Sequence, residues 1–377
     1  MSVVEGLRVL RVSSPLVRPF ITAVRRTDLL EVVLVEATDA DGRVGWGEAA
    51  TSWRVTGESP QSVAAVVAGP LGDTVIARDS GDPALAADIA ASVWGNAAAR
   101  SAVECAVADL AAQERGLSAG AMLSGDGRAA VPRLRTDMTL STATPAELAE
   151  QAVAHVAAGF GCLKIKASAA HDTVAGLRAV RAAVGPAITL RIDANQAWDA
   201  ETAIRVIRTL EDTDLAVELV EQPVAAHDID ALAAVTAAVD TPIMADESVR
   251  TAQDVRMIAD RGAADLVNIK LAKTGGLAEA LVAADVAHDA GLDVVIGCMM
   301  ESHVGVTAAA HLAAAIAPDV VHDLDAALWL RRSPVVGGIR SEAGVLHLGT
   351  GRGFGIDGLG ADADVLADVR TRAGVRA

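Results

Sequence analysis

The sequence predicts an α/β protein in which a barrel of parallel strands carries a separate, smaller α+β domain. The chain has 377 residues, more than one compact core usually holds, so two domains are expected. Strand-like alternation extends to about residue 49, and helical spacing of alanine, valine and leucine follows to about residue 120. From about residue 131, short apolar segments alternate with amphipathic ones, which is the rhythm of βα units in a barrel.

The smaller domain is predicted at residues 1–125. LRVLRVSSP and LLEVVLVEATDADGRVGWGEA read as antiparallel strands, with a hairpin turn from Asp39 to Gly42. PQSVAAVVAGPL and NAAARSAVECAVADLAAQERG have helical spacing, and Gly116 is a plausible helix end. Strands followed by helices indicate an α+β domain.

The barrel is predicted at residues 126–345. Its expected strands are RLRTDMTL, CLKIK, ITLRIDAN, AVELVEQP, PIMADES, DLVNIK, DVVIGCM and VVHDLD. Helical segments such as PAELAEQAVAHVAAG lie between them. Residues 346–377 form a glycine-rich tail that we expect to pack back on the first domain and to end in a short helix. Its glycines only superficially suggest a nucleotide-binding loop, because they do not open a helix within a βαβ unit.

Composition excludes several classes of function. The net charge of −17 argues against nucleic-acid binding, which needs clustered basic residues. The absence of tyrosine excludes phenolic chemistry, and Cys105, Cys162 and Cys298 are expected to be small buried hydrophobic residues. We find neither a signal peptide nor a membrane-spanning stretch, so we expect a cytoplasmic enzyme without a membrane partner.

Polar residues end the predicted barrel strands at intervals of about one βα unit. They are Lys164, Lys166, Asp193, Asn195, Glu221, Asp246, Glu247, Lys270, Asp323 and Asp325. Because active sites of such barrels gather at the C-terminal ends of the strands, these side chains are expected to meet at one mouth.

Asp193, Glu221 and Asp246 come from three adjacent strands. Converging carboxylates repel one another in a buried mouth unless a cation joins them. Oxygen ligands alone suit a hard ion such as Mg²⁺. The alternative is that each carboxylate caps the following helix or pairs with an arginine.

Two pairs of charged residues have the two-residue spacing that puts side chains on one face of a strand. Lys164 and Lys166 disfavour each other's protonation, so one of them can act as a base, and Lys270 is expected to reach the centre from the opposite side. Ordinary salt bridges to the carboxylates are the alternative for these lysines. Asp323 and Asp325 suit a substrate ammonium group, or else a helix cap and one buried pair.

Several motifs resemble the enolase superfamily, in particular its muconate-lactonising enzyme subgroup. They are LKIK, IDAN, VEQP, ADES, NIKLAKTGG and DLD, with RPFITAVRRT, VGWGEA, TGES and GVTAAAHLAAA extending the resemblance over nearly the whole chain. Within the subgroup the chain most resembles the dipeptide epimerases of the L-Ala-D/L-Glu type. The resemblance implies a modified TIM barrel, (β/α)7β, with an α+β capping domain completed by the C-terminal tail. We also expect a homo-oligomer.

The resemblance implies a role for each site residue. One Mg²⁺ per subunit is held by Asp193, Glu221 and Asp246. Lys166 and Lys270 are the two acid–base catalysts on opposite faces of the substrate carbon. Lys164 lowers the pKa of Lys166 and stabilises the enolate oxygen. Asp323 and Asp325 bind the free α-ammonium of a dipeptide, whose C-terminal α-carbon is inverted by 1,1-proton transfer through an enediolate.

Two loops of the capping domain, near residues 18–27 and 51–59, are expected to close the site. In the first, Arg25 stands where such enzymes can contact an acidic side chain, and Arg26 doubles the charge there. His303 lies where close relatives can have a lysine. Two further expected substrate contacts are Thr136 and Met299.

Other readings remain open at this stage. Muconate cycloisomerase, o-succinylbenzoate synthase and N-acylamino acid racemase share the chemistry, but their substrates carry no free ammonium. An aldolase of the TIM-barrel type would use Lys166 or Lys270 as a Schiff base. A silent barrel would bind Mg²⁺ without exchanging substrate protons.

Overall fold

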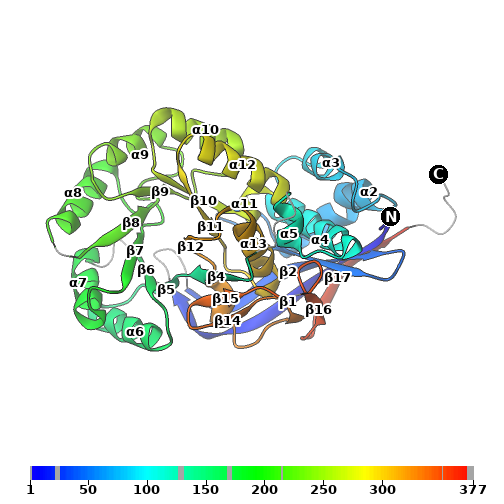
Figure 1. The fold of residues 1–377 in the computed structure, drawn as a ribbon, viewed down its shortest axis with the longest axis horizontal. Helices are drawn as coiled ribbons and strands as arrows, with labels where there is room; N and C mark the ends of the chain where they lie inside the picture. The colour runs from blue at the N-terminus through cyan, green and yellow to red at the C-terminus, as the bar shows by residue number, and fades with distance from the viewer. Residues whose placement is uncertain are drawn as a thin grey trace.

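The computed structural model describes residues 2–21, 26–125, 131–167, 172–213, 215–349 and 351–371. A ring of strands surrounded by helices forms one part of the molecule, and a twisted sheet with helices on one side forms the capping domain beside it (Figure 1). None of the helices formed by the described residues is both long and apolar enough to cross a membrane.

The capping domain is built on a four-stranded antiparallel sheet of order β17-β1-β2-β3. Its strands are β1 (Val4–Ile21), β2 (Arg26–Asp39), β3 (Val44–Ala49) and β17 (Asp364–Arg370). The helical segments are α1 (Pro60–Val66), η1 (Val67–Leu71), α2 (Gly72–Val75), α3 (Leu85–Ser92), α4 (Ala97–Arg115) and α5 (Ala119–Leu123). The predicted hairpin turn is present, since the Gly42 amide donates to Asp39 O at 3.0 Å.

Two glycines of the VGWGEA motif let helix α4 lie directly on strand β3. A Cβ at Gly45 would come within 2.1 Å of Ala106 O, and one at Gly47 within 1.9 Å of Ala102 O. Any larger residue would push the helix away from the sheet. Asp109 of α4 then accepts the amides of Trp46 at 2.9 Å and of Phe354, in the C-terminal tail, at 2.9 Å.

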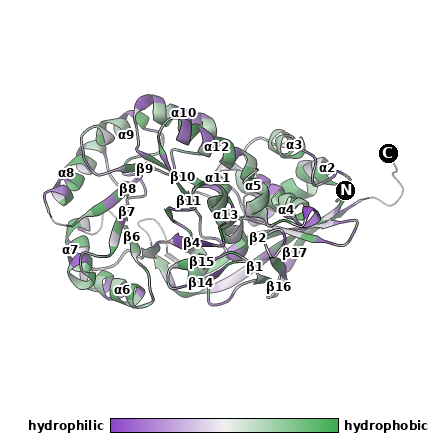
Figure 2. Ribbon diagram, viewed as in Figure 1, coloured by the Kyte–Doolittle hydropathy of each residue, from purple (hydrophilic) through white to green (hydrophobic). Residues whose placement is uncertain are grey.

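The barrel contains seven parallel strands in sequence order, β5 to β11. They are β5 (Met138–Leu140), β6 (Cys162–Lys166), β7 (Thr189–Asp193), β8 (Val217–Glu221), β9 (Ile243–Ala245), β10 (Leu266–Lys270) and β11 (Asp293–Gly297). The surrounding helices are α6 (Pro145–Ala157), α7 (Thr173–Val184), α8 (Ala200–Glu211), α9 (Ile229–Thr236), α10 (Ala252–Arg261), α11 (Leu271–Thr274), α12 (Leu277–Asp289) and α13 (His303–Ile316). The outer helices carry both hydrophobic and hydrophilic faces, as amphipathic helices do (Figure 2).

An eighth strand closes the ring. Strand β12 (Val321–His322) pairs in parallel with β4 (Arg133–Thr136), and Asp323 makes a parallel bridge with Gly297 of β11. The predicted segment RLRTDMTL is thus divided into β4 and β5 by Asp137. All eight predicted strand segments lie in the ring, which confirms the predicted fold class.

The C-terminal tail confirms one expectation and corrects another. Strand β17 pairs with β1, with Leu7 opposite Val369, so the tail completes the capping sheet. The expected short terminal helix is wrong for the described residues, because the unpaired edge of β1 offers backbone hydrogen bonds that favour an extended segment. The remaining elements are η2 (Ala326–Trp329), β13 (Val335–Gly337), β14 (Arg340–Glu342), β15 (Val345–His347) and β16 (Ile356–Leu359). The exact domain boundaries stay a prediction.

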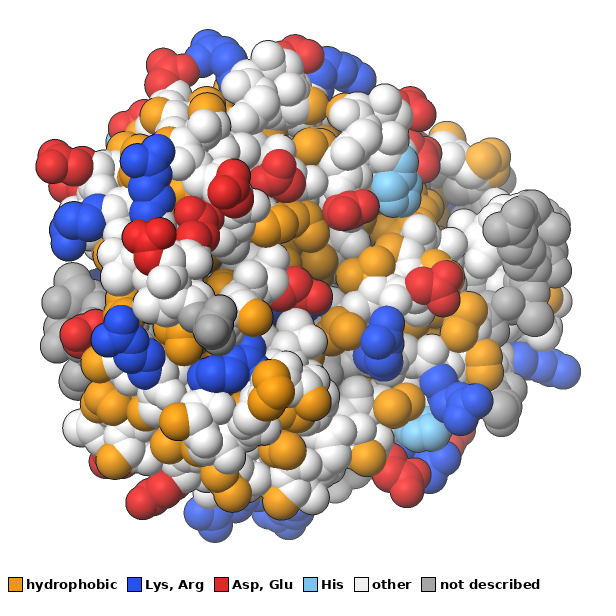
Figure 3. Space-filling model, turned by 60° about the vertical axis from the view of Figure 1, so that its left-hand side comes forward, with side chains coloured by type: hydrophobic (Ala, Val, Ile, Leu, Met, Phe, Trp, Pro, Cys, Tyr) orange, Lys and Arg blue, Asp and Glu red, His pale blue; other side chains and the backbone are white. Residues whose placement is uncertain are grey.

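Charged side chains of both signs are interspersed on the face shown in Figure 3, and the basic ones do not gather there into a single patch.

Candidate active site

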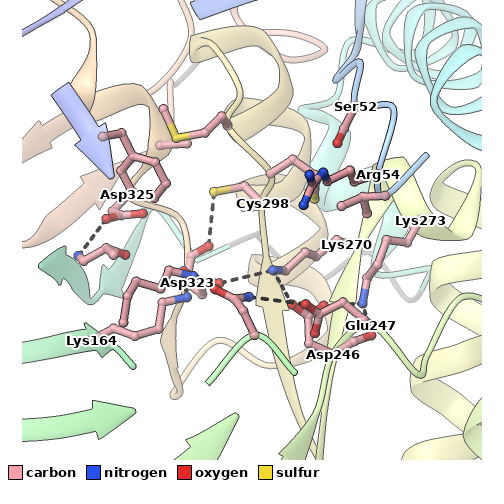
Figure 4. Close-up of a pocket in the computed structure, with 18 of the residues that line it drawn as sticks. Ser52, Arg54, Lys164, Asp246, Glu247, Lys270, Lys273, Cys298, Asp323 and Asp325 are labelled. Carbon is pink, nitrogen blue, oxygen red and sulfur yellow. Dashed lines mark hydrogen bonds and ion pairs between the residues drawn. The ribbon is translucent and has the colours of Figure 1, made fainter. Parts of the chain in front are cut away.

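A cavity of about 620 Å³ opens at the C-terminal ends of the barrel strands, beneath the capping domain. The capping domain contributes Phe20, Thr51, Ser52, Trp53, Arg54 and Val55. The barrel contributes Thr139, Lys164, Lys166, Asn195, Gln196, Asp246, Glu247, Lys270, Lys273, Cys298, Met299, Met300, Asp323, Asp325 and Ala326. Figure 4 shows the charged residues among them pointing toward one another.

The three predicted metal ligands end adjacent strands and are buried. Asp193 is the last residue of β7, Glu221 the last of β8, and Asp246 directly follows β9. Lys164 Nζ lies 3.8 Å from Asp193 Oδ2 and 3.4 Å from Glu221 Oε2. Lys270 Nζ lies 3.9 Å from Glu221 Oε1 and 2.8 Å from Asp246 Oδ2. The fold therefore places Asp193 and Glu221 beside Lys164, and Glu221 and Asp246 beside Lys270, while the oxygens of the three acids do not all lie within 4.8 Å of one another.

The electrostatics of this acidic group fit a divalent cation. Burial and then the charge of Asp193 raise the pKa of Glu221 well above its usual value. Burial, together with Asp246 and Asp193, also raises the pKa of Glu247. Glu247 Oε2 is buried and has no hydrogen-bond partner among the described residues. An oxygen-only donor set with an unpaired oxygen suits Mg²⁺.

The lysines reach the centre from opposite sides of the barrel. Lys164 and Lys166 project from β6, and Lys166 pairs with Asp193. Lys270 ends β10. Burial opposes the charge of Lys164 and Lys270, but the surrounding carboxylates together outweigh it and raise both pKa values well above the usual one. Asp323 contributes most for Lys164 and Asp246 most for Lys270. The predicted effect of Lys164 on Lys166 stays a prediction.

Sequence reasoning missed three side chains that organise this centre. Asn268 Nδ2 donates to Glu221 Oε1 at 2.8 Å and to Asp323 Oδ2 at 3.3 Å. Lys273 Nζ lies 2.5 Å from Asp246 Oδ1, and Gln222 Oε1 accepts the Asp246 amide at 2.9 Å. Asn268 could have been found, because it stands two residues before Lys270 and therefore shares its face of the strand.

Asp323 and Asp325 follow β12 and both line the cavity. Lys164 Nζ lies 2.6 Å from Asp323 Oδ1, and Lys270 Nζ lies 3.7 Å from Asp323 Oδ2. Burial opposes ionisation of Asp323, but these two lysines lower its pKa. Asp325 Oδ2 instead accepts the Thr139 amide at 2.8 Å and Trp329 Nε1 at 3.2 Å.

A second acidic cluster lies on this side of the barrel. Carboxylate oxygens of Asp137, Asp323 and Asp325 lie within 4.8 Å of one another, an arrangement that could also hold a cation. Burial and then Asp323 raise the pKa of Asp137 to about 7. Lys164 and Arg191, whose Nη1 lies 3.2 Å from Asp137 Oδ2, already supply positive charge to this cluster.

Of the other predicted substrate contacts, some line the cavity and others do not. Met299 lines the cavity, whereas Thr136 does not; its hydroxyl accepts the Leu324 amide at 3.0 Å and so supports β12. Arg25 lies outside the described residues, and Arg26 begins β2. His303 begins α13, where burial lowers its pKa. These roles stay predictions.

A capped barrel with acids at the ends of successive strands and lysines on opposite sides defines the class of acid–base enzymes. Residues 5–123 match the family described as mandelate racemase / muconate lactonizing enzyme, N-terminal domain. Residues 147–361 match the family described as enolase C-terminal domain-like. The chain belongs to the mandelate racemase / muconate lactonizing enzyme family of the enolase superfamily, as predicted.

Several relatives of the chain within this family are dipeptide epimerases. The chain is 39% identical to the L-Ala-D/L-Glu epimerase of Bacillus subtilis over 352 residues, covering 92% of this chain and 95% of that enzyme. A substrate-liganded complex of the B. subtilis epimerase superposes with a TM-score of 0.91 at 37% identity, covering 95% and 100% of the two chains. The dipeptide epimerase of Enterococcus faecalis V583, complexed with Mg and L-Leu-L-Tyr, gives 0.88 at 36% identity, covering 94% and 99%. Because these relatives take different dipeptides, similarity alone does not identify the substrate.

Proposed function

We propose that this protein is a Mg²⁺-dependent epimerase that inverts the α-carbon of the C-terminal residue of a dipeptide resembling L-Ala-L-Glu. One observation carries the proposal: Asp323 lies between Lys164 and Lys270, at 2.6 and 3.7 Å, in a cavity that Asp325, Lys166 and Asp246 also line (Figure 4). Acid–base lysines, an ammonium site and a carboxylate group for a cation thus share one space.

The residues divide the reaction between them. Mg²⁺ held by Asp193, Glu221 and Asp246 would supply positive charge to the substrate carboxylate and so stabilise the enediolate. One of Lys166 and Lys270 takes the α-proton onto its Nζ from one face of the carbon. The other returns a proton from its own Nζ to the opposite face, which inverts the centre. Lys164, held beside Glu221 and Asp323, adds positive charge next to the developing enediolate.

Asp323 and Asp325 favour a dipeptide over the related substrates. The substrates of muconate cycloisomerase, o-succinylbenzoate synthase and N-acylamino acid racemase have no ammonium for Asp325, a buried carboxylate that forms no ion pair with the described residues.

Arg54 supports an acidic side chain on the C-terminal residue. It is an exposed residue of the capping loop that lines the cavity, and no described residue pairs with it. Figure 4 places it beside Lys270 and at the end of the cavity away from Asp325. Apolar Phe20, Met299 and Met300 are available for the first residue of the dipeptide. If Arg25 makes the predicted contact with the acidic side chain of the substrate, it would supply a second positive charge there beside that of Arg54.

The test is to incubate the protein with Mg²⁺ and a library of L,L-dipeptides in D₂O and to follow α-deuteration by mass spectrometry. We expect exchange at the C-terminal residue, fastest when that residue is acidic, and its loss when EDTA removes the metal. Binding of Mg²⁺ without exchange of any dipeptide would overturn the proposal in favour of a silent barrel. Borohydride trapping of a lysine with a carbonyl substrate would favour an aldolase.

A further inference from the structure

Asp325 is held by a side chain that the mechanism does not use. Trp329 lies at the end of η2, four residues after Asp325, and is fully buried. Its Nε1 donates to Asp325 Oδ2 at 3.2 Å, and the same oxygen accepts the Thr139 amide at 2.8 Å. No hydrogen bond from the described residues reaches Asp325 Oδ1, so the carboxylate is fixed through one oxygen and keeps the other for a ligand.

The ring of Trp329 is in turn held by the capping domain. Phe20 meets it edge-on, with ring centroids 4.9 Å apart and an interplanar angle of 84°. The guanidinium carbon of Arg18 lies 4.7 Å from the ring centroid. A cation over an indole draws electron density toward itself and should strengthen the N–H as a donor. Both contacts come from the end of strand β1, next to the loop near residues 18–27 that is expected to close the site.

Backbone contacts tie the same two segments together. Leu16 of β1 makes an antiparallel bridge with Leu330, directly after Trp329. The Arg331 amide donates to Pro15 O at 3.1 Å, and Arg331 Nε donates to Leu16 O at 2.9 Å. The end of β1 and the segment after Asp325 are therefore one unit, in which a shift of the strand moves the indole.

We propose that Trp329 is a positioning residue for the ammonium group of the substrate, which orients Asp325 and makes that orientation depend on how β1 is seated. This inference rests on the proposed function, because it assigns Asp325 to the dipeptide ammonium. Phe20 extends the link to the substrate, since it packs on Trp329 and also lines the cavity. The first residue of the dipeptide would thus contact both the carboxylate of Asp325 and Phe20 of strand β1, which helps to position that carboxylate.

The variant Trp329→Phe tests the indole N–H with little change in packing, since an aromatic ring remains for Phe20 and Arg18. Trp46→Phe is the matched control, because Trp46 is also buried and loses the same ring volume, but none of its described hydrogen bonds reaches Asp325. Phe20→Leu is a second variant, which keeps the N–H and removes the edge-on contact. Thermal unfolding of each variant checks that it is folded.

The measurements are calorimetric binding of an L,L-dipeptide, binding of its N-acetyl form, and binding of Mg²⁺, alongside KM and kcat for exchange in D₂O. For Trp329→Phe we expect the Kd and KM of the free dipeptide to rise about tenfold, as for loss of one charge-assisted hydrogen bond. The affinities for Mg²⁺ and the N-acetyl form, and kcat, should stay near those of Trp46→Phe. Phe20→Leu should shift the same quantities in the same direction, but less.

Equal losses for the free and N-acetyl dipeptides, or a fall in kcat at constant KM, would show a merely structural role and overturn the inference. If wild-type protein exchanges dipeptide protons, but Trp329→Phe has the same Kd and KM for the free dipeptide as Trp46→Phe, the inference is overturned and the proposed function stands. Wild-type protein that neither binds nor exchanges any dipeptide would overturn the proposed function and the inference with it.

Discussion

Gly297, the last residue of β11, leaves the space that Lys270 occupies. A Cβ at this position would lie 2.7 Å from Lys270 Cε and 2.3 Å from Asn268 Oδ1. The first distance is about 0.7 Å short of the 3.4 Å at which ordinary contact begins. Lys270 is buried and its Nζ is held 2.8 Å from Asp246, so Gly297→Ala should displace the lysine without removing its charge.

The size of the effect follows from that displacement. Overpacking a core position costs about 1–3 kcal/mol of unfolding free energy, which a folded variant can tolerate. A shift of about 1 Å in a reacting group lowers a rate about 100-fold. The loss should be one-sided, since only the proton that faces Lys270 depends on its position.

The assay follows α-proton exchange in D₂O separately for the two epimers of one dipeptide. In Gly297→Ala, exchange from the epimer that uses Lys270 as base should fall about 100-fold, and exchange from the other epimer much less. Gly161→Ala is the control, because no atom lies within 4 Å of its added Cβ. Wild-type exchange from both epimers in a folded Gly297→Ala protein would refute the assignment of Lys270.

Three further predictions follow from the same geometry. Lys166→Ala and Lys270→Ala should each abolish epimerisation and keep exchange from one epimer only, opposite in the two variants. Arg54→Met should raise KM about tenfold for a dipeptide with an acidic C-terminal residue and leave an apolar one unchanged, while Arg54→Lys restores part of the preference. Burial raises the pKa of Glu104, which accepts the Ala278 amide at 2.7 Å, to about 7. Because this folded pKa lies above the usual value of 4.5 for a glutamate, the stabilising contribution of Glu104 is complete below about pH 4.5 and is lost as pH rises through 7. Glu104→Gln should therefore flatten the dependence of unfolding free energy on pH, by on the order of 3 kcal/mol.

Each of these predictions has an outcome that contradicts it. Normal epimerisation by both lysine variants would rule out the two-base assignment. A uniform rise in KM for acidic and apolar dipeptides in Arg54→Met would mean that the loop is disturbed and that no charge is recognised. Unfolding measured by denaturant from pH 4 to pH 8 would contradict the role of Glu104 if wild type and Glu104→Gln kept the same slope. The expected homo-oligomer can be checked by light scattering of the same samples.

The strand ends of the barrel were predictable because their geometry is simple. Parallel strands that close into a ring bring their C-terminal residues to one mouth, so Lys164, Glu221 and Lys270 could be placed there from their position in each strand. A spacing of two residues likewise put Asp323 and Asp325 together. The same rule, applied one step further, would have included Asn268.

Other features depend on segments far apart in the chain. In the sequence, Trp329 is only a tryptophan that follows the DLD motif. Its proposed role in positioning Asp325 depends on Phe20 and Arg18, which contact its ring. Arg54 lines the cavity because its loop folds over the barrel, where Arg250 Nη2 donates to Val55 O at 2.6 Å.

By itself, the sequence determined the order of strands and helices, the family and the residue types at the barrel mouth, because these follow from periodicity and from position within each strand. Only the tertiary structure decided which acids meet which lysines, and that residues 364–370 of the tail form strand β17 instead of a helix. The physical reason is that a short segment has no strong preference of its own. Its conformation is set by the partner that satisfies its backbone, here the edge of β1 at the other end of the chain.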